Sequence, residues 1–191
     1  TLIGAVDRPV AAGVTAVLVQ LAASMRQHGR GGALLVVPAD SGSWLESVVT
    51  PLPYLLDPPF SELAGLMRVT SPDPDDLKRA VDAIAGLTAV DGATLITDRY
   101  EVLAFGAKIT RRKSSTQVEH VNVTEPVEGS TPIRTTPAHL GGTRHLSAAQ
   151  FVHDQRDATA LVASQDGRFT AFAWSPREAM VRAHRVETLL L

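Results

Sequence analysis

The sequence has no cysteine among its 191 residues. Thiolate metal sites, cysteine nucleophiles, redox motifs and a disulfide framework are therefore excluded. Excess charge is missing too, since 18 lysines and arginines against 20 aspartates and glutamates leave a formal net charge of -2. Without an overall positive field we predict no broad nucleic-acid surface, and any anion binding has to be local.

A long hydrophobic run is also absent. The most apolar stretch near the N-terminus, residues 10–23, is interrupted by Gly13, Thr15 and Gln20, and it falls short of the ~20 apolar residues that a membrane span needs. No cationic segment precedes it, as a signal peptide would require. We predict a cytoplasmic protein with no membrane span in this chain. Because the sequence begins at Thr1, it is compatible with a piece of a longer protein.

Several familiar site motifs are missing as well. The sequence has no Walker loop ending in Gly-Lys-Ser/Thr, no Gly-x-Gly-x-x-Gly, no Gly-x-Ser-x-Gly and no His-Glu-x-x-His. The familiar signatures of P-loop, dinucleotide-binding, serine hydrolase and zinc protease sites are therefore absent. Metal-ligand spacing is also lacking among the histidines, so no role is assigned to His28, His120, His139, His153 or His184.

The composition that remains, 45% hydrophobic and 20% charged residues, is typical of a folded domain. Apolar and capping patterns predict helices over residues 9–28, 60–67, 74–86 and 143–151, and a last helix that begins at Ser175 with Glu178 closing a capping box. The rest of residues 39–68 is expected to be irregular and to pack on a sheet, with Trp44 in the core.

Strand patterns alternate with these helices. A continuous apolar run predicts a buried strand over residues 33–38, and two hairpins are predicted over residues 94–105 and 158–174, the second around an Asp-Gly turn. Residues 111–115 are expected to form a loop, and residues 116–137 a strand and a long loop. The alternation favours an α/β fold with a mixed central β-sheet flanked by helices.

Four short motifs stand at the ends of these elements. Asp91-Gly92-Ala93 precedes a strand, Gly106-Ala107 follows its hairpin partner, Gly142-Thr143-Arg144-His145 begins a helix, and Ser164 stands beside Asp166-Gly167. Each motif alone is compatible with a turn or a helix cap.

In this order, and with these elements between them, the motifs from about residue 77 to residue 174 resemble the diadenylate cyclase domain of the DNA integrity scanning protein and of membrane-bound cyclic di-AMP synthases. In that family an Asp-Gly-Ala motif and an Arg-His-Arg motif hold ATP, and two domains meet face to face so that each ATP attacks the other. The resemblance implies a diadenylate cyclase-like fold, an adenine nucleotide or nucleotide-derived signal as ligand, and a homodimer as a candidate assembly.

The resemblance also implies a set of nucleotide-binding residues. Matched position by position, they are Asp91, Gly92, Ala93, Gly106, Ala107, Gly142, Thr143, Arg144, His145 and Ser164. Amides at a helix N-terminus together with Arg144 suit a phosphate group, and glycines allow the backbone to approach a nucleotide closely. Asp91 is the catalytic candidate if the protein is active, expected to orient a ribose hydroxyl or to hold Mg²⁺ or Mn²⁺ when a triphosphate is bound.

Two positions depart from the family pattern. Leu146 stands where the family has the second arginine of Arg-His-Arg, and Gln165 replaces a carboxylate near the last hairpin. Losing one charged donor to a phosphate costs about 1.5–3 kcal/mol, which lowers the rate about 10- to 100-fold where the contact acts in the transition state. Lys108, Arg111 and Arg112 are candidate replacements for the missing charge.

The leading hypothesis is therefore a divergent, sensor-type domain with degenerate catalytic motifs, which binds a nucleotide and passes its occupancy to a partner. Two alternatives stay open: an active diadenylate cyclase that makes cyclic di-AMP from two ATP, and a ligand-free interaction scaffold. We predict a single domain over residues 1–191. Residues 1–72 are expected to be an N-terminal extension that packs on the sheet, and residues 73–191 the motif-bearing core.

Overall fold

One mixed sheet organises the part of the chain that the computed structural model describes, residues 12–125 and 131–186. Its strand order is β2-β4-β3-β1-β7-β8-β9-β5-β6. The pairs β1–β3 and β5–β9 are parallel and the others antiparallel, so the predicted mixed central sheet flanked by helices is confirmed. The strands are β1 (Gly32–Val37), β2 (Tyr54–Phe60), β3 (Ala93–Thr97), β4 (Val102–Ala107), β5 (Val121–Thr124), β6 (Ile133–Thr135), β7 (Thr159–Ala163), β8 (Phe169–Ser175) and β9 (Met180–Arg185).

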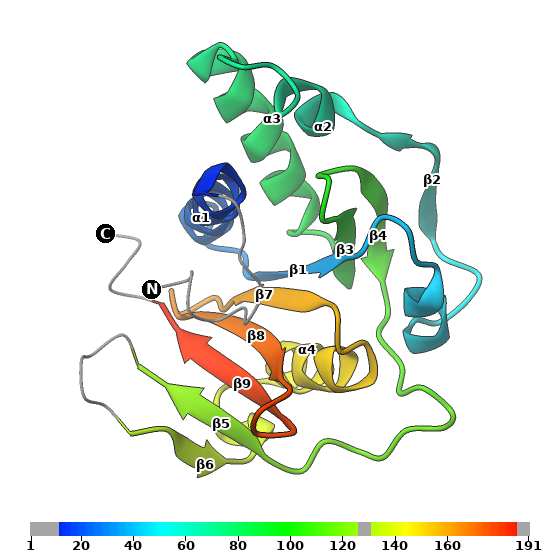
Figure 1. The fold of residues 1–191 in the computed structure, drawn as a ribbon, viewed down its shortest axis with the longest axis vertical. Coiled ribbons are helices and arrows are strands. Elements are labelled where there is room, and N and C mark those ends of the chain that lie inside the picture. Colours follow the sequence, from blue (N-terminus) through cyan, green and yellow to red (C-terminus); the bar gives the residue numbers. More distant parts are fainter. Residues whose placement is uncertain (1–11, 126–130, 187–191) are drawn as a thin grey trace.

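Helices cover both faces of this sheet (Figure 1). On one face α1 (Ala12–Gln27) packs against α3 (Pro74–Leu87), with the short α2 (Glu62–Leu66) beside α3, and on the opposite face lies α4 (Thr143–Asp154). Successive residues of a strand point to opposite faces, so Leu34 packs in the core under α1 and α3, and Leu35 in the core under α4. The described 3-10 helices are η2 (Ser43–Ser47) and η3 (Pro137–His139).

Short local sequence signals set the ends of several elements. The Asp73 carboxylate accepts hydrogen bonds from the backbone N–H groups of Asp75 (2.9 Å) and Asp76 (3.2 Å), and Pro74 occupies the first turn of α3, which confirms the predicted helix. Both predicted hairpins, β3–β4 and β7–β8, are also confirmed. In the β7–β8 turn Gly167 has a φ of +82°, a conformation that side chains disfavour.

The predicted last helix at Ser175 is wrong. Ser175 ends β8, a turn follows with Ala179 at a φ of +48°, and the chain returns as β9, where Met180 pairs with Ser175. The capping signal serves the turn instead, because the N–H of Glu178 donates to the Ser175 hydroxyl (3.4 Å). Alternation in β9 agrees with a strand, since Val181 and Ala183 are buried.

The stretch predicted to be irregular contains a strand. β2 pairs antiparallel with β4 at the edge of the sheet, where Tyr54 lies opposite Phe105 and Phe60 opposite Val102, with a register shift between. The strand was not predicted from the sequence because it contains two prolines, Pro58 and Pro59, which interrupt the strand pattern. Prolines are confined to such edges because they donate no hydrogen bond to a neighbouring strand.

The first 72 residues contribute strands to the same sheet as the motif-bearing residues. β1 lies between β3 and β7, and β2 forms one edge. Trp44, in η2, is only 8% exposed and belongs to the core under α4, as expected for an aromatic residue in this segment. None of the described helices is both long and apolar enough to cross a membrane.

Candidate functional site

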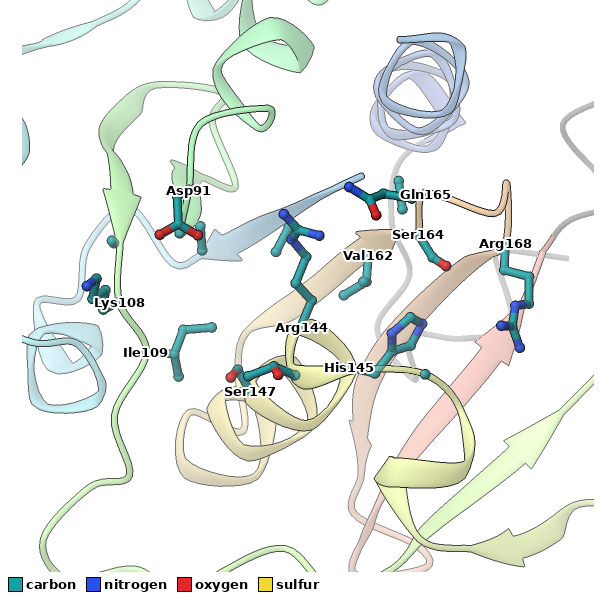
Figure 2. A pocket seen from close by; sticks show the side chains of 18 of the residues that line it. Asp91, Lys108, Ile109, Arg144, His145, Ser147, Val162, Ser164, Gln165 and Arg168 are labelled. Atoms are coloured by element: carbon teal, nitrogen blue, oxygen red, sulfur yellow. The ribbon is translucent and has the colours of Figure 1, made fainter. Parts of the chain in front are cut away.

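A cavity of about 680 Å³ opens where the start of α4 meets one end of the sheet (Figure 2). Its walls come from the start of β3, the end of β4, the first turn of α4, and the turn between β7 and β8. Nine of the ten residues expected at a nucleotide site line it, although as many as 73 positions, from Asp91 to Ser164, separate them in the sequence. They are Asp91, Gly92, Ala93, Ala107, Gly142, Thr143, Arg144, His145 and Ser164.

Small side chains from four adjacent strands form the floor of the cavity. Strand register aligns Ala107 of β4 with Ala93 of β3, Ala93 with Ala33 of β1, and Ala33 with Val162 of β7. All four line the cavity. A row of such short side chains leaves space above the sheet that larger ones would fill. Ala33 and Val162 were missed in the sequence because only the strand register brings them to the motifs.

The first turn of α4 offers unpaired donors to the cavity. Gly142 is the N-cap residue and supplies no side-chain cap, while the N–H of His145 already donates to the Gly142 carbonyl (3.0 Å). The first N–H groups of a helix have no partner within it, so those of Thr143 and Arg144 remain for a ligand. The helix dipole adds about half a positive charge at this end.

The Arg144 side chain extends into the cavity toward Gln165, with Asp91 and Lys108 on the side of β3 and β4 (Figure 2). Its Nη1 atom lies 3.2 Å from the point where a Cβ on Gly31 would stand. Across the described part of the chain, the Arg144 side chain makes no hydrogen bond or ion pair with a protein group. A half-buried guanidinium without a protein partner is suited to a bidentate contact with phosphate.

Gly106, the tenth expected residue, does not line the cavity. It lies beneath Gly92, because a Cβ on Gly92 would come within 2.5 Å of the Gly106 carbonyl carbon. A Cβ on Gly106 would in turn meet the Tyr54 ring at 3.0 Å. Both glycines have positive φ, +108° and +66°. Their lack of side chains thus lets β3, β4 and β2 approach one another behind the site.

His145 lines the cavity but is 2% exposed. Its ring fits against Gly141, where a Cβ would collide with it, and makes an edge contact with Phe172. Burial, and then the charge of Arg168, lower the pKa of His145 below its ordinary value of 6.5. The imidazole is therefore neutral at pH 7.

The turn between β7 and β8 holds a closed set of polar contacts at the cavity rim. The Ser164 hydroxyl donates to Asp166 Oδ1 (2.6 Å), and Arg168 Nε donates to Asp166 Oδ2 (2.7 Å). Hydrogen bonds from Arg168 and Ser164 hold the pKa of Asp166 below its usual range. The Asp166 charge is thereby committed to Arg168. Neither residue was assigned from the sequence, where the Asp-Gly pair was interpreted as a turn.

The two departures from the family pattern differ in their surroundings. Leu146 is partly buried against the core under α4 and is not among the residues that line the cavity. Gln165 does line it, with its Cγ 3.3 Å from where a Cβ on Gly31 would stand. Of the three candidate replacements for the missing arginine, Lys108 lines the cavity, whereas Arg111 and Arg112 do not.

Carboxylates for a metal ion are few. Asp91 and Asp166 line the cavity, and Asp166 is bound by Arg168. Within residues 12–125 and 131–186, no group of three or more histidine, aspartate or glutamate side chains is arranged to hold a metal ion.

A second cavity, of about 430 Å³, lies at the opposite end of α4. Its wall is polar and includes the Asp154 carboxylate, whose side chain is fully buried. The Asp154 carboxylate accepts hydrogen bonds from the backbone N–H of Arg112 (2.8 Å) and from Gln150 Nε2 (2.9 Å). Gln155 Nε2 donates to the Ser43 carbonyl and to the Ser47 hydroxyl, both at 2.9 Å. These groups join η2 and the loop before β5 to the helix.

No protein-family model and no curated protein matches this sequence. Among solved structures, the chain is similar to a hypothetical membrane spanning protein from Bacillus cereus (15% identity, TM-score 0.43, covering 88% of this chain and 62% of that one). It is also similar to a double mutant of DacA from Staphylococcus aureus (14% identity, TM-score 0.42, covering 90% and 85%). The chain thus spans less than two thirds of the length of the first. At TM-scores below 0.5, neither likeness carries weight for the function of this chain.

Proposed function

We propose that this chain is a diadenylate cyclase-like domain that binds an adenine nucleotide in the cavity at the start of α4 and acts as a sensor with degenerate catalytic motifs. The observation that carries the proposal is the convergence of three separate motifs on one cavity, around Asp91, Arg144 and Ser164. A cavity of this size lies within the range of small-molecule sites.

The phosphate group of the nucleotide is proposed to lie at the start of α4. There the N–H groups of Thr143 and Arg144 and the Arg144 guanidinium converge, and anions bind well at such helix ends. Lys108, the residue that follows β4, lines the same cavity and supplies a second positive charge. The Asp91 carboxylate can accept a hydrogen bond from a ribose hydroxyl. If the ligand is a triphosphate, Asp91 also offers an oxygen to the Mg²⁺ or Mn²⁺ that accompanies it.

Impaired synthesis follows from what surrounds positions 146 and 165. Leu146 packs into the core under α4 instead of presenting a charge to the ligand. Gln165 presents a neutral amide where the family has a carboxylate, and the neighbouring Asp166 is bound by Arg168. Transition-state charge therefore meets fewer fixed partners, whereas ground-state binding keeps Arg144 and the helix amides. Occupancy is then proposed to be passed to a partner protein, with a second copy of this chain as a candidate.

The binding site is tested by replacing its arginine. Arg144→Gln should weaken nucleotide binding about 10- to 100-fold, because the hydrogen bonds to a charged group are worth about 1.5–3 kcal/mol. Isothermal titration calorimetry with AMP, ATP and cyclic di-AMP measures the change. Arg111→Gln is the matched control, since Arg111 is exposed and outside the cavity, and it should bind like the wild type. Failure of the wild type to bind any of the three nucleotides would support the ligand-free scaffold.

Turnover separates the sensor from the enzyme. Purified protein is incubated with ATP and Mg²⁺ or Mn²⁺, and the products are separated by chromatography and identified by mass spectrometry. The sensor predicts that nucleotide is recovered unchanged. Accumulation of cyclic di-AMP at an enzyme-like rate, abolished by Asp91→Asn, would instead establish the cyclase.

A further inference from the structure

The charges that line the nucleotide cavity nearly cancel. Its ionised side chains are those of Asp91, Lys108, Arg144, Asp166 and Arg168. Asp166 and Arg168 form an ion pair, with Arg168 Nε 2.7 Å from the Asp166 carboxylate, so that pair contributes little net charge. His145 is neutral at pH 7 because its burial lowers its pKa.

What is left for a ligand is a small positive excess. Arg144 and Lys108 together carry two positive charges, Asp91 removes one, and the start of α4 adds about half a charge. A phosphate monoester carries about −1.5 to −2 at pH 7, close to the magnitude of this excess. A triphosphate carries roughly twice that charge. The second and third phosphates would then meet Asp91, Gln165 and an arginine already engaged by Asp166.

The carboxylates also fit a divalent ion poorly. Proteins hold Mg²⁺ beside phosphates with one or two carboxylates, and here the Asp166 carboxylate is bound on both oxygens, by Ser164 and Arg168. Asp91 alone remains among the residues that line the cavity, on the exposed rim. A divalent ion on a triphosphate therefore finds one available carboxylate among the residues that line the cavity, which is the smallest number that such sites use.

We infer that this cavity recognises a phosphate ester of one or two negative charges, such as a nucleoside monophosphate, without a divalent ion. The inference rests on the proposed function, because it assigns the ligand class of the same site. Asp91 then acts as a specificity residue, whose charge repels additional phosphates while its oxygens accept hydrogen bonds from a ribose.

The first experiment compares AMP, ADP and ATP by isothermal titration calorimetry on the whole chain, with EDTA and with Mg²⁺. AMP should bind with a Kd that Mg²⁺ changes less than about twofold, and affinity should not rise from AMP to ATP. A Kd for Mg²⁺-ATP more than about threefold below that for AMP would overturn the inference and leave the proposed function standing. Binding of none of these nucleotides would overturn both.

The sign of one substitution gives an independent test. Asp91→Asn should tighten AMP binding about threefold, because a like charge near the phosphate is removed. If Asp91 instead held a metal ion, the same change would weaken ATP binding in Mg²⁺ and leave AMP in EDTA unaffected or weaker, which would contradict the inference. Glu119→Gln, an exposed residue outside the cavity, controls for the change in net charge. Thermal unfolding of each variant verifies that it is folded.

Discussion

The two ends of α4 face two cavities that are built on opposite principles. At the start of the helix, Gly142 provides no cap, and Arg144 has no protein partner among the residues that the structure describes. At the other end Asp154 and Gln155 are buried and hydrogen-bonded to two other segments of the chain, η2 and the loop before β5. One end leaves its polar groups available, and the other satisfies them internally.

The difference between polar groups with and without protein partners distinguishes a candidate ligand site from a structural contact. A buried polar group that is satisfied by the protein stabilises one arrangement of segments, and a ligand has little to gain from it. Donors that converge on a cavity without partners are stabilised only when something binds. On this basis the residues around Asp154 form a junction that fastens η2 and the loop before β5 to α4, and the cavity beside Arg144 is the proposed binding site.

The largest effect is expected at the junction. Asp154→Ala removes the acceptor for the part-buried backbone N–H of Arg112 and one of the two acceptors of the buried Gln150 amide, which keeps only its hydrogen bond to the Thr116 carbonyl (3.0 Å). The free energy of unfolding should fall by about 3 kcal/mol, measured by urea denaturation. Nucleotide affinity should change less than about twofold, because the site lies at the other end of α4.

Asp157→Ala is the matched control for that change. Asp157 also lines the second cavity but is exposed, so water can replace what its carboxylate contacts, and the cost should stay below about 1 kcal/mol. A large loss of nucleotide affinity in a folded Asp154→Ala protein would show that the Asp154 region affects ligand binding. The contrast between the two ends of α4 would then be wrong.

A smaller effect is expected behind the binding site. Gly92→Ala should lower the free energy of unfolding by about 2–3 kcal/mol, because the new Cβ meets the Gly106 backbone at 2.5 Å and Gly92 has a φ of +108°. Gly142→Ala, on the opposite wall, should cost less than about 1 kcal/mol, since its φ is −75° and nothing lies within 4 Å of its Cβ position. Equal costs in chemical denaturation would show that Gly92 is not a packing constraint.

Structural features that depend on a few adjacent residues, such as helix starts and tight turns, were predictable from the sequence. Asp73 and Pro74 specify the start of α3, and the Asp166-Gly167 pair specifies the β7–β8 turn. Most of the motif residues that line the cavity at the start of α4 could be named for the same reason, because each motif stands at the end of a locally recognisable element. Their roles in binding stay predictions that the experiments above address.

Features that depend on distant partners could not be predicted. Ser175 followed by proline begins a helix or a tight turn equally well, and β9 forms because β8 and β5 supply hydrogen bonds on both of its sides. β2 exists only because the edge of β4 accepts it. The row of small residues from Ala107 to Val162 is likewise set by strand register, which no short stretch of sequence encodes.

The smallest effect is a pH dependence that belongs to the binding end of α4. Burial, with Arg168 and Arg185 adding to it and Asp166 opposing it, sets the pKa of His145 below its ordinary value of 6.5. Well above pH 6.5 the ring is neutral in the folded and unfolded states alike. As the pH falls through 6.5, His145 binds a proton in the unfolded chain but not in the folded chain. The free energy of unfolding therefore decreases with falling pH until the pKa of the folded state is reached.

Urea denaturation at pH 7 and at pH 5.5 should therefore show a loss of about 1–2 kcal/mol, about 1 kcal/mol of it from His184, whose pKa burial lowers to about 4. His145→Gln should reduce that loss, whatever it costs at pH 7, because only the difference between the two pH values reports on the proton. An unchanged loss would show that the ring at the start of α4 is hydrated. Saturating AMP should also reduce the loss in the wild type, since a phosphate beside His145 raises its pKa and lets the folded chain accept the proton. AMP should leave the loss in His145→Gln unchanged, which assigns the effect to the binding end of the helix.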